Sequence, residues 1–135
     1  MKEQLSDVLE NSRNYTLAVA ELMPADLYNS KPVDTVWNFG ELLNHIAYGI
    51  EWWESNYIRK IETEWNPPVI SSDKKAVIKY LEKSYKILQK TLESIEFNKE
   101  NIKGFHATTD HITHHRGQAV LHLRVNGITP PEYIY

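Results

Sequence analysis

A stretch at the end of the chain's first third decides the fold, and it reads Trp37-Asn38-Phe39-Gly40-Glu41-Leu42-Leu43-Asn44-His45-Ile46-Ala47. Its first residues have the pattern of a capping box, in which Asn38 caps a helix and Glu41 reaches back to the Asn38 backbone. The apolar residues that follow recur every three or four positions, which is the spacing of one buried helix face. The stretch therefore predicts an amphipathic helix that begins here and extends to about Thr63.

The same helical spacing recurs on both sides of this stretch, and no segment alternates convincingly in the way that a strand does. Further helices are expected over residues 5–22, 72–95 and 105–126. Pro24 ends the first of these, because proline disrupts an ordinary helix. Gly127 ends the last, because glycine is favoured just past a helix C-terminus.

Four helices predict an all-α protein with the fold of a four-helix bundle, and 135 residues favour a single domain over residues 1–135. The connection between the second and third helices contains Glu64-Trp65-Asn66-Pro67-Pro68 and is long. A long connection lets the third helix run parallel to the second. We therefore expect the order up-down-down-up.

The composition argues against several classes of protein. The chain has no cysteine, so it has no disulfide framework and no thiolate nucleophile, which fits a cytoplasmic protein. The net charge is −3 and both signs are interspersed, which argues against a nucleic-acid-binding face. No stretch has the apolar length of a membrane span, and the first residues lack the apolar core of a signal peptide.

Histidines form the pattern that points to chemistry. The last predicted helix contains Asp110-His111-Ile112-Thr113-His114-His115-Arg116-Gly117-Gln118. His111 and His115 are four residues apart, which places both imidazoles on one helix face. With His45 from the second helix they would supply three neutral nitrogen ligands, a set that suits zinc, nickel, iron or copper. Three protein ligands leave a position open for water or substrate, as in catalytic metal sites.

Two other histidines are expected to have different roles. His114 points about 100° away from His115 around the helix, and His122 lies roughly 10 Å further along the axis. Neither can share one ion with His111 and His115. For His45 taken alone, the simpler interpretation is a core histidine that is hydrogen-bonded to a neighbour.

Four residues are expected to line a pocket or to support the ligands: Glu41, Gly49, Trp52 and Gln118. Gly49 lies one turn from His45 and leaves space that Trp52 could wall. Glu41 could orient the His45 imidazole, although the capping role competes for the same carboxylate.

Better-known metal motifs are excluded by single positions. A zincin has glutamate directly after its first histidine, where this chain has Ile112. A di-iron bundle needs Glu-x-x-His on two helices, whereas Glu41 and His45 are four residues apart. One ion per site is therefore expected.

Gly117 stands in the middle of a predicted helix, where glycine costs about 1 kcal/mol relative to alanine. We expect that it permits close approach of a neighbouring backbone, within the bundle or across a dimer. The alternative is a tolerated glycine without a role.

Two stretches resemble signatures of the DinB family. They are the second-helix stretch Asn38–Ala47 and the C-terminal pair formed by His111–Gln118 and Leu123–Tyr133. The resemblance covers essentially the whole chain. It implies an up-down-down-up four-helix bundle that carries nickel or zinc on His45, His111 and His115, and that is often dimeric.

The resemblance leaves the reaction open. Some relatives resemble S-transferases or isomerases that use a low-molecular-weight thiol, and others resemble hydrolases. Because no carboxylate base is expected beside the ligands, we favour thiol transfer to a small-molecule substrate over hydrolysis. The alternatives are a non-catalytic protein whose ion ties the second helix to the fourth, and a metal-free bundle that acts as a stress-related interaction module. A homodimer is expected, without a nucleic-acid or membrane partner.

Overall fold

The computed structural model describes residues 1–135, which form four long helices and no strand. The helices are α1 (Lys2–Leu22), α2 (Phe39–Trp53), α3 (Lys74–Ser94) and α4 (Lys99–Val125). A 3-10 turn, η1 (Ala25–Leu27), follows α1, and a π-helical turn, η2 (Glu54–Ile58), continues α2. The predicted all-α fold is confirmed. No helix combines the length and the apolar character that crossing a membrane requires.

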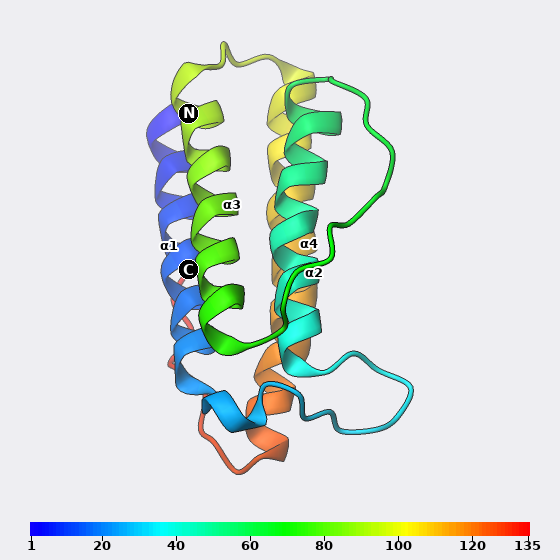
Figure 1. Ribbon diagram of the computed structural model, residues 1–135. Coiled ribbons are helices and arrows are strands. Elements are labelled where there is room, and N and C mark those ends of the chain that lie inside the picture. The colour runs from blue at the N-terminus through cyan, green and yellow to red at the C-terminus, as the bar shows by residue number, and fades with distance from the viewer.

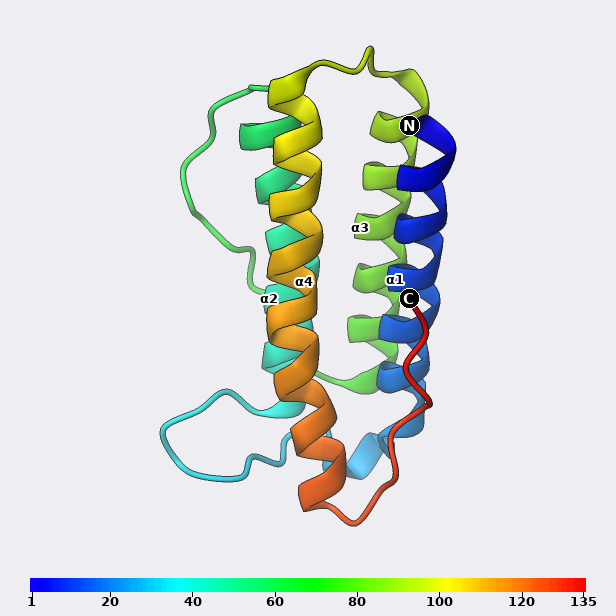
Figure 2. The same ribbon diagram turned by 180° about the vertical axis from the view of Figure 1, so that it is seen from behind.

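The helices form a bundle with the predicted order of directions. In Figure 1, α1 runs down, α2 and α3 run up, and α4 runs down. Helix α2 packs against α3 and α4, and α1 packs against the same two helices. The link of residues 59–73 runs along the outside of the bundle and returns the chain to the end where α2 began, so α3 is parallel to α2. Figure 2 shows the C-terminal tail, residues 128–135, turning back along α1.

The start of α2 is fixed by the predicted capping box. The Oδ1 atom of Asn38 accepts a hydrogen bond from the backbone N–H of Glu41 at 2.8 Å. The Oε2 atom of Glu41 accepts one from the backbone N–H of Asn38 at 3.0 Å. Two backbone donors that the helix leaves free are thereby satisfied at its first turn.

The expected end of α2 at Thr63 is wrong. The regular helix ends at Trp53 and widens into η2. There the buried carboxylate of Glu54 accepts hydrogen bonds from Arg59 at 3.0 Å and from Thr91 of α3 at 2.5 Å. Within η2, the Oδ1 atom of Asn56 accepts a hydrogen bond from the backbone N–H of Thr63 in the link that follows, at 2.9 Å. These side chains turn the backbone aside although its apolar pattern continues.

Helix α4 begins at Lys99, six residues before the expected start at Phe105. Its first turn is closed by a second capping box, in which Asn98 and Asn101 exchange hydrogen bonds at 2.9 and 2.8 Å. Asparagine replaces the usual glutamate or glutamine as the residue that reaches back, so the pattern is harder to recognise in the sequence.

Gly117 does not mark a close approach within the chain. A Cβ atom added there would meet no atom within 4 Å. The expectation of close packing inside the bundle is therefore wrong, and Gly117 is a mid-helix glycine that faces open space.

Candidate metal centre

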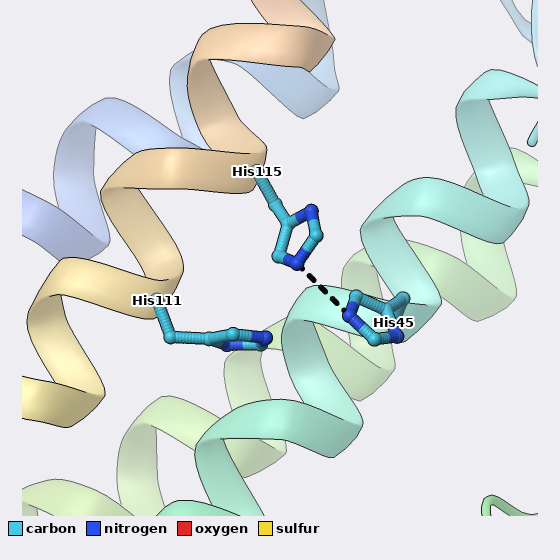
Figure 3. A group of neighbouring side chains, drawn as sticks. All are labelled: His45, His111 and His115. Atoms are coloured by element: carbon cyan, nitrogen blue, oxygen red, sulfur yellow. Dashed lines mark hydrogen bonds between the residues drawn. The ribbon is translucent and has the colours of Figure 1, made fainter. Parts of the chain in front are cut away.

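Three histidines converge between α2 and α4. His45 projects from α2, and His111 and His115 project from successive turns of α4 (Figure 3). The Nε2 atoms of His45 and His115 lie 3.0 Å apart. One nitrogen from each ring can be chosen so that all three lie within 4.8 Å of one another. The structure thus brings together the three residues that the sequence nominated.

The spacing of the nitrogens fits a divalent ion. Two zinc–nitrogen bonds of about 2.0–2.1 Å at a tetrahedral angle place the nitrogens roughly 3.3 Å apart. The 3.0 Å separation of the His45 and His115 Nε2 atoms is close to this value. The Nδ1 atom of His111 is buried without a hydrogen-bond partner, so this ring retains free donor or acceptor capacity. The residues present therefore suit a nitrogen-preferring metal.

The electrostatics of the cluster keep the imidazoles neutral. Burial, followed by the charge of His115, lowers the pKa of His45 to about 4. Burial, followed by the charges of its three histidine neighbours, lowers the pKa of His111 to about 4. Burial also lowers the pKa of His115, against the opposing effect of its hydrogen bond with Gln118. Neutral imidazole is the form that binds metal, so near pH 7 protons compete little for the site.

Gln118 orients one of the ligand rings. The Nδ1 atom of His115 donates a hydrogen bond to the Oε1 atom of Gln118 at 2.9 Å. The proton is thereby held on Nδ1, and Nε2 presents its lone pair toward His45. Such a hydrogen bond is how proteins commonly fix the tautomer and rotation of a metal-binding histidine.

Gly49 has a different role from the one expected. A Cβ atom at this position would lie 2.7 Å from Nδ1 of His111, and nearer still to Cε1. Real Cβ atoms essentially never approach so closely. Gly49 therefore makes room for the ring of His111 itself, and the expectation that it borders open space beside His45 is wrong.

Glu41 serves the helix cap. Its carboxylate accepts from the Asn38 backbone, and no hydrogen bond joins it to His45. Of the two roles that the sequence left open for Glu41, the structure shows the cap of α2 and not the orientation of His45. Glu41 nevertheless lines the two cavities described below.

The aromatic wall of the cluster comes from three tryptophans other than Trp52. The rings of Trp37 and Trp65 lie 4.4 and 5.5 Å from the ring of His45, and the ring of Trp53 lies 5.7 Å from that of His111. Trp52 instead donates a hydrogen bond to the Thr63 carbonyl at 3.1 Å and packs against Trp65 at 5.4 Å.

Sequence reasoning missed these three residues as parts of the site. A helical spacing of one turn from Gly49 could have identified Trp53. No local pattern could have placed Trp65, because it lies in the irregular link between α2 and α3.

His114 and His122, two further histidines of α4, lie outside the cluster, as expected. The ring of His114 is 4.8 Å from that of His115, but its nitrogens do not join the group of three. His122 is buried near Phe39, 6.0 Å between ring centres, and burial lowers its pKa.

Two cavities open beside the cluster. His45 lines one of about 310 Å³, together with polar residues that include Asn44 and Ser72. His115 lines another of about 850 Å³, between the loop that precedes α2 and the C-terminal half of α4. Trp37 lines both cavities. The histidine cluster is therefore accessible to small molecules from the side on which Trp37 lies.

The fold and the cluster define a four-helix bundle with a three-histidine candidate metal site between its second and fourth helices. The chain belongs to the DinB superfamily, whose family model matches residues 9–122.

Two solved structures share the fold over nearly the whole chain. A DinB-like protein from Bacillus cereus ATCC 10987 is 19% identical, with a TM-score of 0.82 over 98% of this chain and 97% of the other. A DinB-like protein from Bacillus subtilis is 23% identical, with a TM-score of 0.69 over 96% of this chain and 97% of the other. At these identities the likeness shows the fold alone. No protein of curated function matches the chain.

Proposed function

We propose that the protein binds one divalent ion, nickel or zinc, through His45, His111 and His115. The observation that carries the proposal is the convergence of three imidazoles whose nitrogens lie within 4.8 Å of one another. Two further features support it. Burial lowers the pKa of each ring, and Gln118 holds the His115 proton away from the cluster. Three neutral nitrogen donors suit these metals better than magnesium or calcium.

We further propose that the bound ion serves catalysis. A divalent ion on three imidazoles supplies a Lewis acid that lowers the pKa of a thiol or a water molecule. The cavities lined by His45 and His115 support this function, since an ion with a purely structural role needs no access for substrate. Trp37 and Trp65, packed on the ring of His45, would shield the reacting atoms from bulk water.

Thiol transfer is favoured over hydrolysis by proton chemistry. A free thiol has a pKa near 8.5 and bulk water one near 15.7, so a thiol needs far less help to ionise at pH 7. Glu41, the acidic residue that lines both cavities, already accepts a hydrogen bond from the Asn38 backbone. Asp34 lines only the larger cavity, and no carboxylate is hydrogen-bonded to the three histidines, so none is held beside them to take a proton from water. A low-molecular-weight thiol is accordingly the proposed nucleophile.

The test begins with untagged protein, because a histidine tag would bind the same metals. Metal content is measured after purification and after reloading with nickel or zinc. Turnover is then followed with L-cysteine and 1-chloro-2,4-dinitrobenzene, in which the sulfur bonds to the ring carbon, chloride leaves with the bonding electrons, and the thiol proton passes to solvent.

The proposal expects one ion per chain and turnover that is lost on chelation and restored by metal. One ion per chain with a raised melting temperature, but without turnover of thiol or ester substrates, would instead favour an ion that only ties α2 to α4. If the protein holds no stoichiometric ion after reloading, the metal proposal is overturned.

We also propose that the protein is a cytoplasmic homodimer, on the strength of its resemblance to its family. Sedimentation at micromolar concentration measures this directly. A single species of 15.8 kDa would contradict the dimer.

A further inference from the structure

The larger cavity beside the cluster has the dimensions of a ligand site. It measures about 850 Å³, and small-molecule pockets usually have volumes of about 300–1,000 Å³. On α4 its lining extends from His115 to His122, seven residues or about 10 Å along the helix axis. In Figure 1 the loop that forms the opposite wall, drawn in cyan, stands out from the foot of the bundle. The cavity is thus an elongated groove with a metal ligand at one end.

The walls of this groove expose mainly apolar surface. They include Val33 and Val36 of the loop, Leu42 of α2 and Leu121 of α4. Three of these side chains are exposed to solvent, Leu121 by 57%. Single exposed apolar residues are common on protein surfaces, but here they gather around one cavity. The groove therefore offers apolar surface that the fold itself does not cover.

Two of the charged residues of the groove, Lys31 and Glu41, are hydrogen-bonded to the backbone. The Nζ atom of Lys31 donates a hydrogen bond to the backbone carbonyl of Asp34 at 3.3 Å. Glu41 accepts one from the Asn38 backbone at 3.0 Å. Asp34 adds a carboxylate to the lining, and the apolar side chains supply most of the surface offered to a ligand.

The second cavity differs in character and size. It is about 310 Å³ and has a mixed lining, with polar residues such as Asn44 and apolar ones such as Pro68 and Ile70 beside His45. Trp37 borders both cavities, and its ring lies 4.4 Å from the ring of His45 and 6.1 Å from that of His115. The cluster thus has a small cavity of mixed lining on one side and a larger groove with mainly apolar exposed lining on the other, so the apolar part of a substrate fits the groove.

We propose that the groove binds the apolar part of a small-molecule substrate, an aliphatic or aromatic chain of about six to eight carbons, whose polar head reaches the three histidines. The length follows from the distance of about 10 Å between His115 and His122 along α4. Leu121 and the two loop valines hold the chain, and Trp37 covers the point where chain and head meet. The proposal rests on the proposed function for the head group and on the groove alone for the apolar chain.

The first experiment tests the groove without metal. 1-Hexanol is titrated into the metal-free protein, and methyl signals are followed by NMR. Saturable shifts are expected for Val33, Val36 and Leu121. The control is Val8 of α1, which is 46% exposed but does not line the groove, and its methyls should not move. Shifts of equal size at Val8, or no shift at the three groove residues, would overturn the proposal.

The second experiment links the groove to the metal site. Acetohydroxamate and octanohydroxamate share a metal-binding head and differ by six methylenes. A fully buried methylene contributes about a factor of four to affinity, so six half-buried ones give about 60-fold tighter binding to the nickel-loaded protein. Leu121→Glu should reduce this ratio to about tenfold or less and leave acetohydroxamate affinity unchanged.

Val125→Glu is the matched control for this substitution. Val125 lies one turn further along α4, is 56% exposed and does not line the groove. Val125→Glu should keep the ratio of about 60 between the affinities for octanohydroxamate and acetohydroxamate. Equal ratios in the two variants would overturn the proposal.

The outcomes separate the groove from the metal proposal. If the nickel-loaded protein binds neither hydroxamate, the open metal site fails, while the hexanol shifts still decide the groove. If the methyls of Leu121 and the loop valines shift with protein concentration alone, and Leu121→Glu abolishes both this shift and dimerisation, the surface is an interface between two copies of the chain, and the ligand proposal is overturned.

Discussion

His115 and Arg116 are consecutive residues of α4, yet the polar group of one faces a cavity and that of the other is enclosed in the protein interior. The His115 ring faces His45 and a cavity, and its neighbours outside the cluster are Gln118 and the rings of Trp37 and His114. Arg116 is only 4% exposed, and its guanidinium lies 4.7 Å from the ring centre of Tyr15. One side of the helix presents polar atoms to a cavity, and the other encloses them in the protein interior.

The enclosed side is completed by its neighbours. The Nη1 atom of Arg116 donates to the Ser12 carbonyl at 3.4 Å, and the hydroxyl of Tyr15 donates to the carbonyl of Pro131 in the C-terminal tail. Nearby, the buried hydroxyl of Tyr85 is hydrogen-bonded to Ser12 and Thr16. Here the polar groups have protein partners, as buried groups in stable interiors normally do.

The comparison shows what marks a candidate site in this bundle. Burial of polar groups does not distinguish it, because both sides contain them. The histidine cluster differs because its nitrogens converge on one another, one of them lacks any partner, and cavities open onto it. The predictions below test whether the two sides of α4 separate metal binding from stability.

The largest effect on metal binding is expected when one of the three histidines is replaced. His111→Ala or His115→Ala should reduce bound metal from about one ion per chain to none and weaken affinity by more than about 100-fold, because each removes one of three donors. His114→Ala should leave binding unchanged, since this ring lies outside the group. Metal analysis and calorimetric titration provide the measurements. Equal loss in His114→Ala would mean that the wrong helix face has been assigned to the ion.

The next largest effect on metal affinity is expected at Gly49, which leaves room for the ring of His111. Gly49→Ala places a Cβ atom 2.7 Å from Nδ1 of His111, so the ring must move. We expect metal affinity to fall by about 10–100-fold, as when the support of a ligand is lost. Gly117→Ala is the matched control, because it adds the same atom to a helix where nothing lies within 4 Å. It should stabilise the protein by about 0.5–1 kcal/mol and leave metal affinity unchanged. Unaltered affinity in Gly49→Ala would show that His111 does not need its present position.

Arg116→Ala tests the enclosed side. The substitution removes packing against Tyr15 and Tyr133 and leaves a cavity, so we expect a loss of about 2–3 kcal/mol in the free energy of unfolding. Metal affinity should change less than about threefold. Urea unfolding of metal-free protein measures the stability, with Arg124→Ala as the control on an exposed position of the same helix. A loss of metal binding as large as that of His115→Ala would erase the distinction between the two sides.

The sequence predicted those parts of this comparison that depend on local spacing. Helical periodicity gave the bundle, and the interval of four residues between His111 and His115 put both rings on one face of α4. The capping box at Asn38 gave the start of α2. Each of these depends on residues within one or two helical turns, where geometry follows from spacing.

The sequence could not predict features that depend on distant contacts. The end of α2 is set partly by Glu54 meeting Thr91 of α3, and the aromatic wall by Trp65 of the link meeting His45. Similarly, Gly49 was expected to border a cavity because nothing in its surroundings along the chain shows that His111, 62 positions away, would occupy the space.

The smallest effect is expected for the residue that supports a ligand through one hydrogen bond. Gln118→Ala removes the acceptor that lies 2.9 Å from Nδ1 of His115. The ring then rotates more freely and its proton can move to Nε2, the nitrogen that faces His45, so metal affinity should fall by about tenfold. Gln118→Glu restores an acceptor and should recover most of that affinity, which a role in packing alone would not explain. Calorimetric titration at pH 7 distinguishes these cases. Equal weakening in both variants would mean that Gln118 does not orient the ligand, and that the difference between the two sides of α4 lies in the three histidines alone.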